Sequence, residues 1–268
     1  MKKNIAIILI FLPMLIFNTV LTAEQALAAG EFDVYGTIES FTWKEFDDSG
    51  GEFLEESGPI YGAGITAKGL IQPLTIKGRA ELFSGSVDYD GQTQAGMSVK
   101  SDTEYLGGKV EADLGWLIVI DETFALEPFA GIGYRWWERN IKSTGTVIGY
   151  TENWWSSYVR LGLRSESEIS TQSKLFAEAG IKIAIKNENE VDLTEIGLPL
   201  ITVEPANATA FFAEIGLRGE PFVISVFYEG LRFKKSDMVI VSVGPAILGF
   251  TQPESEADIF GLNAGFAF

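Results

Sequence analysis

From residue 29 onward, apolar residues recur at every second position in stretches of about ten residues, separated by turn-rich segments. Alternate residues of a β-strand point to the same face, so each stretch predicts a strand with one apolar face. Residues 174–186 show the pattern best. One face carries Leu175, Ala177, Ala179, Ile181, Ile183 and Ile185, and the other carries Lys174, Glu178, Lys182 and Lys186. The pattern predicts an all-β chain.

Ten such stretches follow one another along the chain. A count of eight or twelve strands remains open. The boundaries of strands predicted from a sequence carry an error of about two to four residues. The predicted strands span residues 31–43, 59–69, 74–85, 104–117, 125–138, 154–165, 174–186, 208–218, 221–233 and 257–268.

The N-terminus has the three parts of a secretory signal peptide. Lys2 and Lys3 precede an apolar run from Ile5 to Leu21, and Ala26-Leu27-Ala28 supplies small residues for cleavage. We predict that residues 1–28 are removed and that residues 29–268 form the folded domain. A membrane-anchoring helix is the alternative reading of the same run.

No later segment is long enough to cross a bilayer as a helix. The uncharged run from Met238 to Gln252 is shorter than the roughly 18 residues required. Long and short connections alternate between the predicted strands, as in bacterial outer-membrane barrels whose turns and termini face the periplasm. We therefore predict an antiparallel, up-and-down transmembrane β-barrel in a Gram-negative outer membrane. A soluble sandwich, with its apolar faces turned inward, is the alternative.

The last predicted strand ends the chain on an aromatic residue. Phe260, Leu262, Phe266 and Phe268 all lie on its apolar face. The segment resembles the terminal strand of bacterial outer-membrane barrels, and the chain resembles the small-barrel class of OmpA-like and OmpX-like proteins. The resemblance implies that these four residues form the signal read by the barrel assembly machinery, and that the barrel lies in outer-membrane lipid and lipopolysaccharide.

Tryptophans fall at the ends of the predicted strands. Aromatic rings gather at both membrane–water interfaces of outer-membrane barrels, so we predict two girdles on the lipid-facing surface. The loop-side girdle would contain Trp43, Trp136, Trp137, Trp154 and Trp155, and the turn-side girdle would contain Trp116.

The polar faces carry nearly balanced charges, although the chain has a formal net charge of −17. Most of the acidity must therefore lie in connections, as with Glu45, Glu52, Glu55 and Glu56. A narrow barrel with opposite charges inside favours an ion-paired plug, and a narrow porin-like channel for small solutes is the alternative. The predicted lumen network comprises Lys77, Arg79, Glu81, Lys109, Glu111, Asp113, Arg135, Arg160, Arg164, Glu178, Lys182, Glu214 and Arg218.

Enzymatic chemistry finds little support. The ten-stranded omptin proteases resemble this architecture, but their chemistry uses a histidine, and this chain has no His and no Cys. We expect no catalytic site, cofactor or metal, and the acidic charge disfavours nucleic acid. The expected role is that of a structural or surface-interaction protein with an unknown extracellular ligand.

Two connections are unusually apolar for exposed loops, namely Ile196–Val203 and Met238–Phe250. We predict that the second forms a β-hairpin that turns at Gly244-Pro245 and stands above the membrane. The two loops would pack together as a lid over the lumen or as a docking surface for a partner, and we favour the lid.

Overall fold

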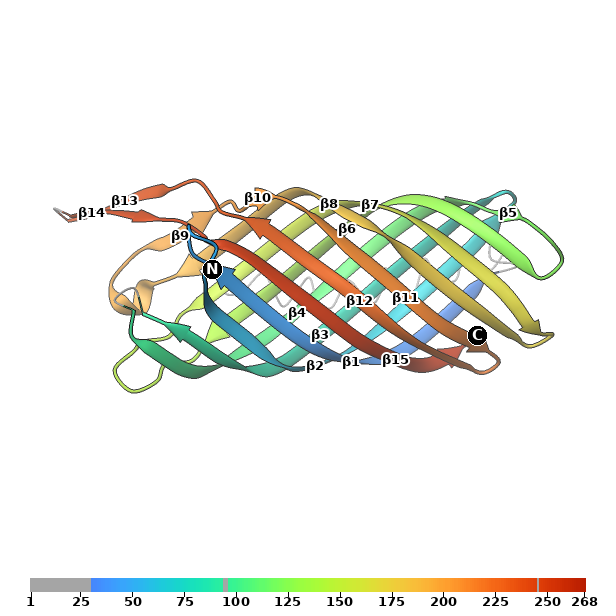
Figure 1. The fold of residues 1–268 in the computed structure, drawn as a ribbon, viewed down its shortest axis with the longest axis horizontal. Helices are drawn as coiled ribbons and strands as arrows, with labels where there is room; N and C mark the ends of the chain where they lie inside the picture. The colour runs from blue at the N-terminus through green and yellow to red at the C-terminus, as the bar shows by residue number, and fades with distance from the viewer. Residues whose placement is uncertain (1–29, 94–95, 245) are drawn as a thin grey trace, which may run out of the picture.

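The computed structural model describes residues 30–93, 96–244 and 246–268, so the predicted signal peptide lies outside the described residues. Ten long antiparallel strands form a closed barrel (Figure 1). In this part of the chain, no helix is long and apolar enough to cross a membrane. The barrel strands are β1 (Glu31–Phe46), β2 (Glu52–Ile71), β3 (Leu74–Gln92), β4 (Ser98–Trp116), β6 (Phe124–Ile141), β7 (Thr151–Ser170), β8 (Ser173–Asp192), β11 (Thr209–Gly219), β12 (Phe222–Lys234) and β15 (Glu254–Ala267).

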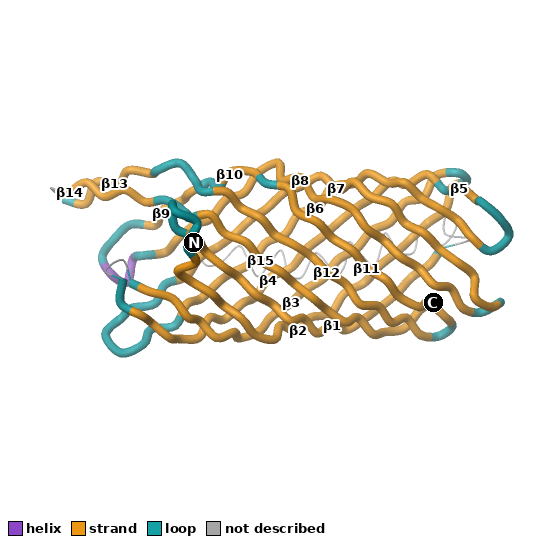
Figure 2. The backbone as a smooth tube through the Cα atoms, viewed as in Figure 1, coloured by secondary structure: helices purple, strands orange, loops and turns teal. Residues whose placement is uncertain are grey.

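Each strand pairs with its neighbours in sequence, and β15 closes the barrel by pairing with both β12 and β1. Short turns join the strands at the end of the barrel where the C-terminus lies, and longer connections gather at the opposite end (Figure 2). We call these the turn side and the loop side. The predicted all-β fold and the count of ten strands are confirmed.

The turn-side part of the outer surface is apolar. Leu82, Leu106 and Ile132 project outward and are 62–64% exposed. This band rules out the soluble sandwich, in which apolar faces would point inward. Its width suits the roughly nine to eleven residues that a spanning strand needs.

The strands extend further toward the loop side than predicted. The first connection spans only residues 47–51, and Glu45 and Glu56, expected in a loop, lie in β1 and β2. Above the membrane the outward positions are polar, which gives these strand segments the composition of loops.

Lys186 was predicted to face the lumen and does not. The pairing of β7 with β8 shifts between Ser157 and Tyr158, and the partners change from Lys186 to Ala184. The extra residue, Ile185, reverses the alternation, as a β-bulge does. Lys186 therefore lies outside and pairs with Glu188 at 2.7 Å.

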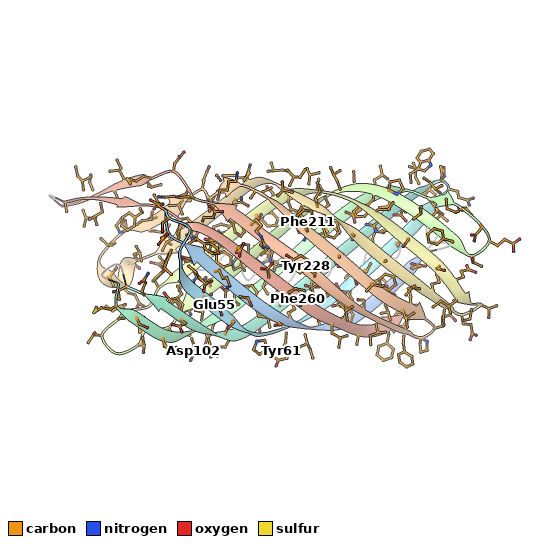
Figure 3. All side chains as sticks on the ribbon, viewed as in Figure 1. Glu55, Tyr61, Asp102, Phe211, Tyr228 and Phe260 are labelled. Atoms are coloured by element: carbon orange, nitrogen blue, oxygen red, sulfur yellow. The ribbon has the colours of Figure 1, made fainter. Side chains whose placement is uncertain are left out.

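The girdle prediction is wrong for Trp43, Trp137 and Trp154, which are at most 3% exposed and lie inside the barrel. Trp116 is exposed at the turn side, and Trp136 and Trp155 lie half-buried on the outward-facing positions of β6 and β7. The rings labelled on the barrel wall in Figure 3 are Tyr61, Phe211, Tyr228 and Phe260, and those of Tyr61, Phe211 and Phe260 are 55–65% exposed. Adjacent tryptophans face opposite sides of a strand, so only one of each pair can belong to a girdle.

Smaller elements complete the chain. β5 (Ile118–Val119) lies in a turn-side connection, and η1 (Thr194–Ile196), β9 (Leu200–Val203) and β10 (Ala206–Asn207) lie between β8 and β11. β13 (Val239–Val243) and β14 (Ala246–Phe250) pair as the predicted hairpin, with Gly244 in the left-handed conformation and Pro245 outside the described residues.

Candidate functional site in the barrel interior

The turn-side interior is filled with charged side chains, and Arg160 on β7 lies at their centre. Its guanidinium nitrogens approach Glu111 and Asp113 at 2.9 Å and Glu178 at 2.6 Å. These four side chains are at most 3% exposed. A buried charge is tolerated only when it is paired and hydrogen-bonded, and this arrangement supplies both.

Arg164, four residues further toward the turns on the same strand, binds three carboxylates as well. It contacts Glu127 at 2.6 Å and also Asp113 and Glu178. Glu178 accepts a further hydrogen bond from Lys77 at 2.8 Å. Glu178 therefore joins three cations from β3 and β7.

Toward the loop side the network continues through Glu229. This carboxylate lies 2.6 Å from Lys182, 2.7 Å from Lys109 and 3.2 Å from Arg135. Lys182 reaches back to Glu111 at 3.1 Å, which links this group to Arg160. Charges from β4, β6, β8 and β12 thus meet across the lumen.

Toward the turns the pairs become more exposed. Lys68 lies 2.9 Å from Glu127, and Arg218 lies 2.9 Å from Asp33. The Arg218 side chain is 18% exposed, against 3% for Arg160. The network therefore opens gradually to the turn-side solvent.

All thirteen side chains predicted for the lumen form ion pairs in the structure. Arg79 with Glu214 stands apart as a separate pair, and Glu81 contacts Lys109 at 3.1 Å. Glu31 and Glu166 were not predicted, and they bind Lys174 at the turn-side mouth. Strand parity located the inner faces, but it could not tell which charges would meet across the barrel.

An aromatic layer fills the loop-side interior. Trp137 and Trp154 stack with their ring centroids 5.3 Å apart and 8° between their planes. Trp43 and Phe233 pack against Trp154 at 5.3 and 5.1 Å. These rings form a hydrophobic core inside the barrel at a level where the outer surface is polar.

Arg139 lies above these rings and shares three buried carboxylates. It contacts Glu56 at 2.8 Å, Glu152 at 2.9 Å and Glu45 at 3.0 Å. The indole N–H groups of the layer below donate to two of them, Trp43 to Glu45 at 3.0 Å and Trp154 to Glu152 at 2.8 Å. The aromatic layer and the Arg139 cluster are therefore one connected unit.

The Arg139 cluster has more acidic groups than cations. Burial raises the pKa of Glu45 above its ordinary value of 4.5, and the positive charge of Arg139 opposes that rise. Glu152 and Glu56 raise the pKa further, because like charges disfavour ionisation. Glu45 therefore holds its proton to higher pH than a free glutamate does.

Sequence reasoning missed Arg139, Glu152 and the inner positions of Glu45 and Glu56. A signal for Arg139 was present, because Arg135, Trp137 and Arg139 alternate along one strand and must share a face. Assigning Arg135 to the lumen therefore assigns the other two residues as well.

The apolar connection after β8 places two buried side chains at the loop-side end of the barrel. β9 pairs with the end of β8, which places Ile201 and Val203 inside, where they are 2–3% exposed. Asn189 on β8 donates to the side-chain oxygen of Gln252 at 3.0 Å, which ties β8 to the segment before β15. In the part of the chain that is described, no group of three or more potential ligands is arranged to hold a metal ion.

Comparison with known proteins identifies a matching family and barrels of similar fold. The model of the family described as "Autotransporter beta-domain" matches residues 41–220. Outer membrane protease OmpT from Escherichia coli superimposes with a TM-score of 0.60 at 10% identity, over 90% of this chain and 97% of that one. The translocator domain of autotransporter NalP from Neisseria meningitidis gives a TM-score of 0.39 at 8% identity, over 96% and 95% of the two chains. No curated protein sequence matches.

The family match covers more than half of the chain, and the structural similarity agrees with it in fold. The outward apolar band is a lipid-facing wall, and the family match places it in the outer membrane with its lipid and lipopolysaccharide. The chain is therefore an outer-membrane β-barrel that belongs to the autotransporter β-domain family.

Proposed function

We propose that this protein is a closed barrel with a structural or surface-interaction role. The observation that carries the proposal is the double filling of its lumen. The ion-paired network occupies the membrane-embedded part, and the aromatic layer with Arg139 occupies the part above it. Solute or ion passage would have to disrupt both layers.

A narrow channel for small solutes is the second candidate. A cavity of about 70 Å³ opens at the turn side, lined by residues that include Tyr35, Lys77, Arg79 and Glu214. A buried water needs at least about 10–15 Å³, so only a few waters fit. The cavity lies against Glu178 and Arg164 of the network, and it favours a solvated vestibule over a continuous pore.

We further propose that the protein is not an enzyme. The similarity to OmpT extends to the fold alone at 10% identity. The chain offers no histidine for the chemistry expected of omptin proteases. The adjacent carboxylates Glu111 and Asp113 are both held by Arg160, which leaves neither as a free acid or base.

The family description suggests export of an attached polypeptide as another role. Passage of a chain through the lumen would require the same disruption of both layers, so the filled state described here favours the closed role. The assembly machinery remains a proposed partner through Phe260, Leu262 and Phe266 of β15 and the following Phe268, which are 41–71% exposed.

Planar-bilayer conductance of the purified barrel tests the proposal. We expect no single-channel steps from the parent, and none from the variant Trp154→Ala, because the ion-paired network still fills the membrane part. A double variant, Trp154→Ala with Arg160→Ala, should conduct if its barrel remains closed by β1 and β15. Steady conductance by the parent would establish the channel and refute the closed role.

A further inference from the structure

The β13–β14 hairpin extends along the barrel axis beyond the other described loop-side segments (Figure 1). Its root is held firmly. The backbone N–H of Ser236 donates to the carbonyl of Gln252 at 3.0 Å, and the N–H of Gln252 donates to the Ser236 hydroxyl at 2.8 Å. The hairpin is thus a fixed projection from the loop side of the barrel.

Both faces of the hairpin are apolar. Ile240 and Ile247 are 67% and 74% exposed on one face. Val241 lies opposite Leu248, and Val239 opposite Phe250, on the other face. β13 and β14 form a two-stranded sheet of their own, joined to no other strand in the described ranges. The Ile240 and Ile247 face is strongly exposed, whereas the Val241 and Leu248 face is half-buried. Exposing apolar side chains to water is unfavourable, which indicates that something covers them.

The charges at the root of the hairpin indicate what covers its apolar side chains. Arg232, Lys234 and Lys235 precede the uncharged run that begins at Met238. Lys235 also contacts Asp48 and Arg232 contacts Asp258, whereas Lys234 is exposed. Basic residues beside an exposed apolar segment are typical of elements that lie in a phospholipid interface, where the bases meet phosphates and the apolar side chains enter the acyl boundary.

A lipid interface also accommodates both faces, whereas a protein groove would cover one. The outer edges of β13 and β14 are unpaired, and unpaired backbone groups are excluded from the hydrocarbon core. Insertion would therefore stop at the headgroup and acyl boundary, at a depth of about 5–10 Å. Asp237 and Glu254 beside the root weaken attraction to a strongly anionic surface, so a mainly zwitterionic one fits best.

The hairpin cannot serve the membrane that holds the barrel. The exposed rings of Tyr61, Phe211 and Phe260 lie on the barrel wall, and the hairpin projects beyond them at the loop side (Figures 1 and 3). Aromatic rings of this kind gather at the edge of the membrane that holds a barrel, so the hairpin points away from that membrane. We propose that the β13–β14 hairpin docks the protein onto the phospholipid surface of a second membrane. This inference rests on the proposed surface-interaction role and gives it a specific partner.

The full chain in lipid nanodiscs allows a direct test. The sequence contains no cysteine, so Ser242→Cys provides a single labelling site on the face that carries Ile240 and Ile247. An environment-sensitive dye at this site should shift to the blue with vesicles of phosphatidylcholine containing a minority of phosphatidylglycerol. The labelled protein should also float with those vesicles.

The double variant Ile240→Asn with Ile247→Asn should weaken vesicle binding by at least about tenfold, since a tenfold change corresponds to only about 1.4 kcal/mol. Ile148→Asn, an exposed apolar position in another loop-side connection, is the matched control and should bind as the parent does. Lys234→Gln with Lys235→Gln should reduce binding several-fold with phosphatidylglycerol present and leave binding to pure phosphatidylcholine unchanged.

Three outcomes would overturn the inference. They are a dye spectrum unchanged by either kind of vesicle, vesicle binding that survives the double isoleucine variant, and dimerisation of the nanodisc-held protein through the hairpin without vesicles. The last outcome would identify a second copy of the chain as the occupant. Conductance of the same protein separates the two proposals. A barrel that conducts ions and binds vesicles refutes only the closed role. A barrel that neither conducts ions nor binds vesicles refutes only the docking.

Discussion

Two parts of the same strand show how differently the two halves of the barrel are built. On β4, Val110 points outward and Glu111 inward, whereas nearer the loops Glu104 points outward and Tyr105 inward. The alternation of faces is unbroken, but the polarity of the faces has reversed. The turn-side half is apolar outside because lipid surrounds it, and the loop-side half is apolar inside because water does.

This reversal gives each half its own kind of interior contacts. The membrane half must hold its interior together with charges, because its apolar side chains face lipid, and buried charges have to be paired. The loop-side half can bury aromatic rings as a soluble domain does, and it adds one buried ionic cluster around Arg139. The halves should therefore differ in what destabilises them and in how they respond to pH.

The largest effect is expected where the membrane half closes. The N–H of Phe268 donates to the carbonyl of Phe32 at 2.8 Å, and its exposed ring ends the apolar face of β15. Deleting Phe268 should strongly lower the yield of folded barrel in the outer membrane, because both the pairing and the proposed assembly signal are lost. Phe268→Tyr is the control and should assemble.

Heat-modifiable migration of the protein from isolated outer membranes measures that yield. A deletion variant that accumulates and migrates like the parent would show that closure of the membrane half does not depend on the last residue.

The next effect probes the ionic filling. Glu178→Gln removes the charge that Lys77, Arg160 and Arg164 share, and it leaves cations buried. The free energy of unfolding should fall by roughly 3–5 kcal/mol, the usual loss when one partner of a buried pair is removed. Denaturant unfolding in lipid vesicles measures it.

Glu188→Gln on the same strand is the matched control. Glu188 pairs with Lys186 on the outer surface, where exposed pairs contribute at most about 1 kcal/mol. Equal losses for the two variants would show that the interior network is no more important than a surface pair.

The third effect probes the aromatic filling. Trp154→Ala removes a ring that stacks on Trp137 and contacts Phe233, together with an indole donor to Glu152. Replacing a buried Trp by Ala costs about 3–5 kcal/mol in a soluble core. We expect the lower end of that range, about 3 kcal/mol, because Trp43 and Trp137 still fill part of the layer.

Protease sensitivity of the loop-side connections in the folded barrel shows where that loss falls. Cleavage near Ile201 should increase in Trp154→Ala, and Trp155→Ala, on the outer face of the same strand, should behave as the parent does. A Trp154→Ala barrel with unchanged stability and cleavage would mean that the loop-side half is not held by its aromatic core.

The sequence was enough for the architecture of the membrane half and not for the loop-side half. Strand parity plus a lipid-facing apolar band fixes inside and outside for residues such as Arg160 and Leu161. Above the membrane the same parity remains, but the solvent changes. Trp43 and Trp154 at strand ends fitted a girdle equally well, and one bulged residue, Ile185, reversed the face of Lys186. The boundary between the lipid-facing and water-facing halves depends on how far each residue lies along the barrel axis. The sequence alone does not give that distance.

The Arg139 cluster was hidden for a related reason. Glu45 and Glu56 are separated by the first connection and surrounded by other acidic residues, so they resemble solvated loop positions. Their cation comes from β6, 83 residues beyond Glu56. Pairing between residues so far apart in the sequence depends on the stagger of the strands in the closed barrel. The apolar hairpin at Met238–Phe250 was predictable because its whole sequence pattern is local.

The smallest effect separates the halves by pH. Burial raises the pKa of Glu45 above 4.5, so the folded barrel binds this proton more tightly than the unfolded chain does. The folded state is then favoured at low pH and loses stability as pH rises from 4.5 toward the raised pKa.

The variant Glu45→Gln removes the charge and keeps a neutral side-chain oxygen that can accept the hydrogen bonds from Trp43 and Arg139. The variant should therefore match the parent near pH 4 and exceed it modestly near pH 8, measured by denaturant unfolding at each pH. Glu52→Gln, an exposed carboxylate in the adjoining strand, should leave the parent's pH profile unchanged. A Glu45→Gln barrel that is less stable than the parent at pH 8 would show that Arg139 needs all three charges, and that the loop-side cluster, like the network around Arg160, holds as fully ionised pairs.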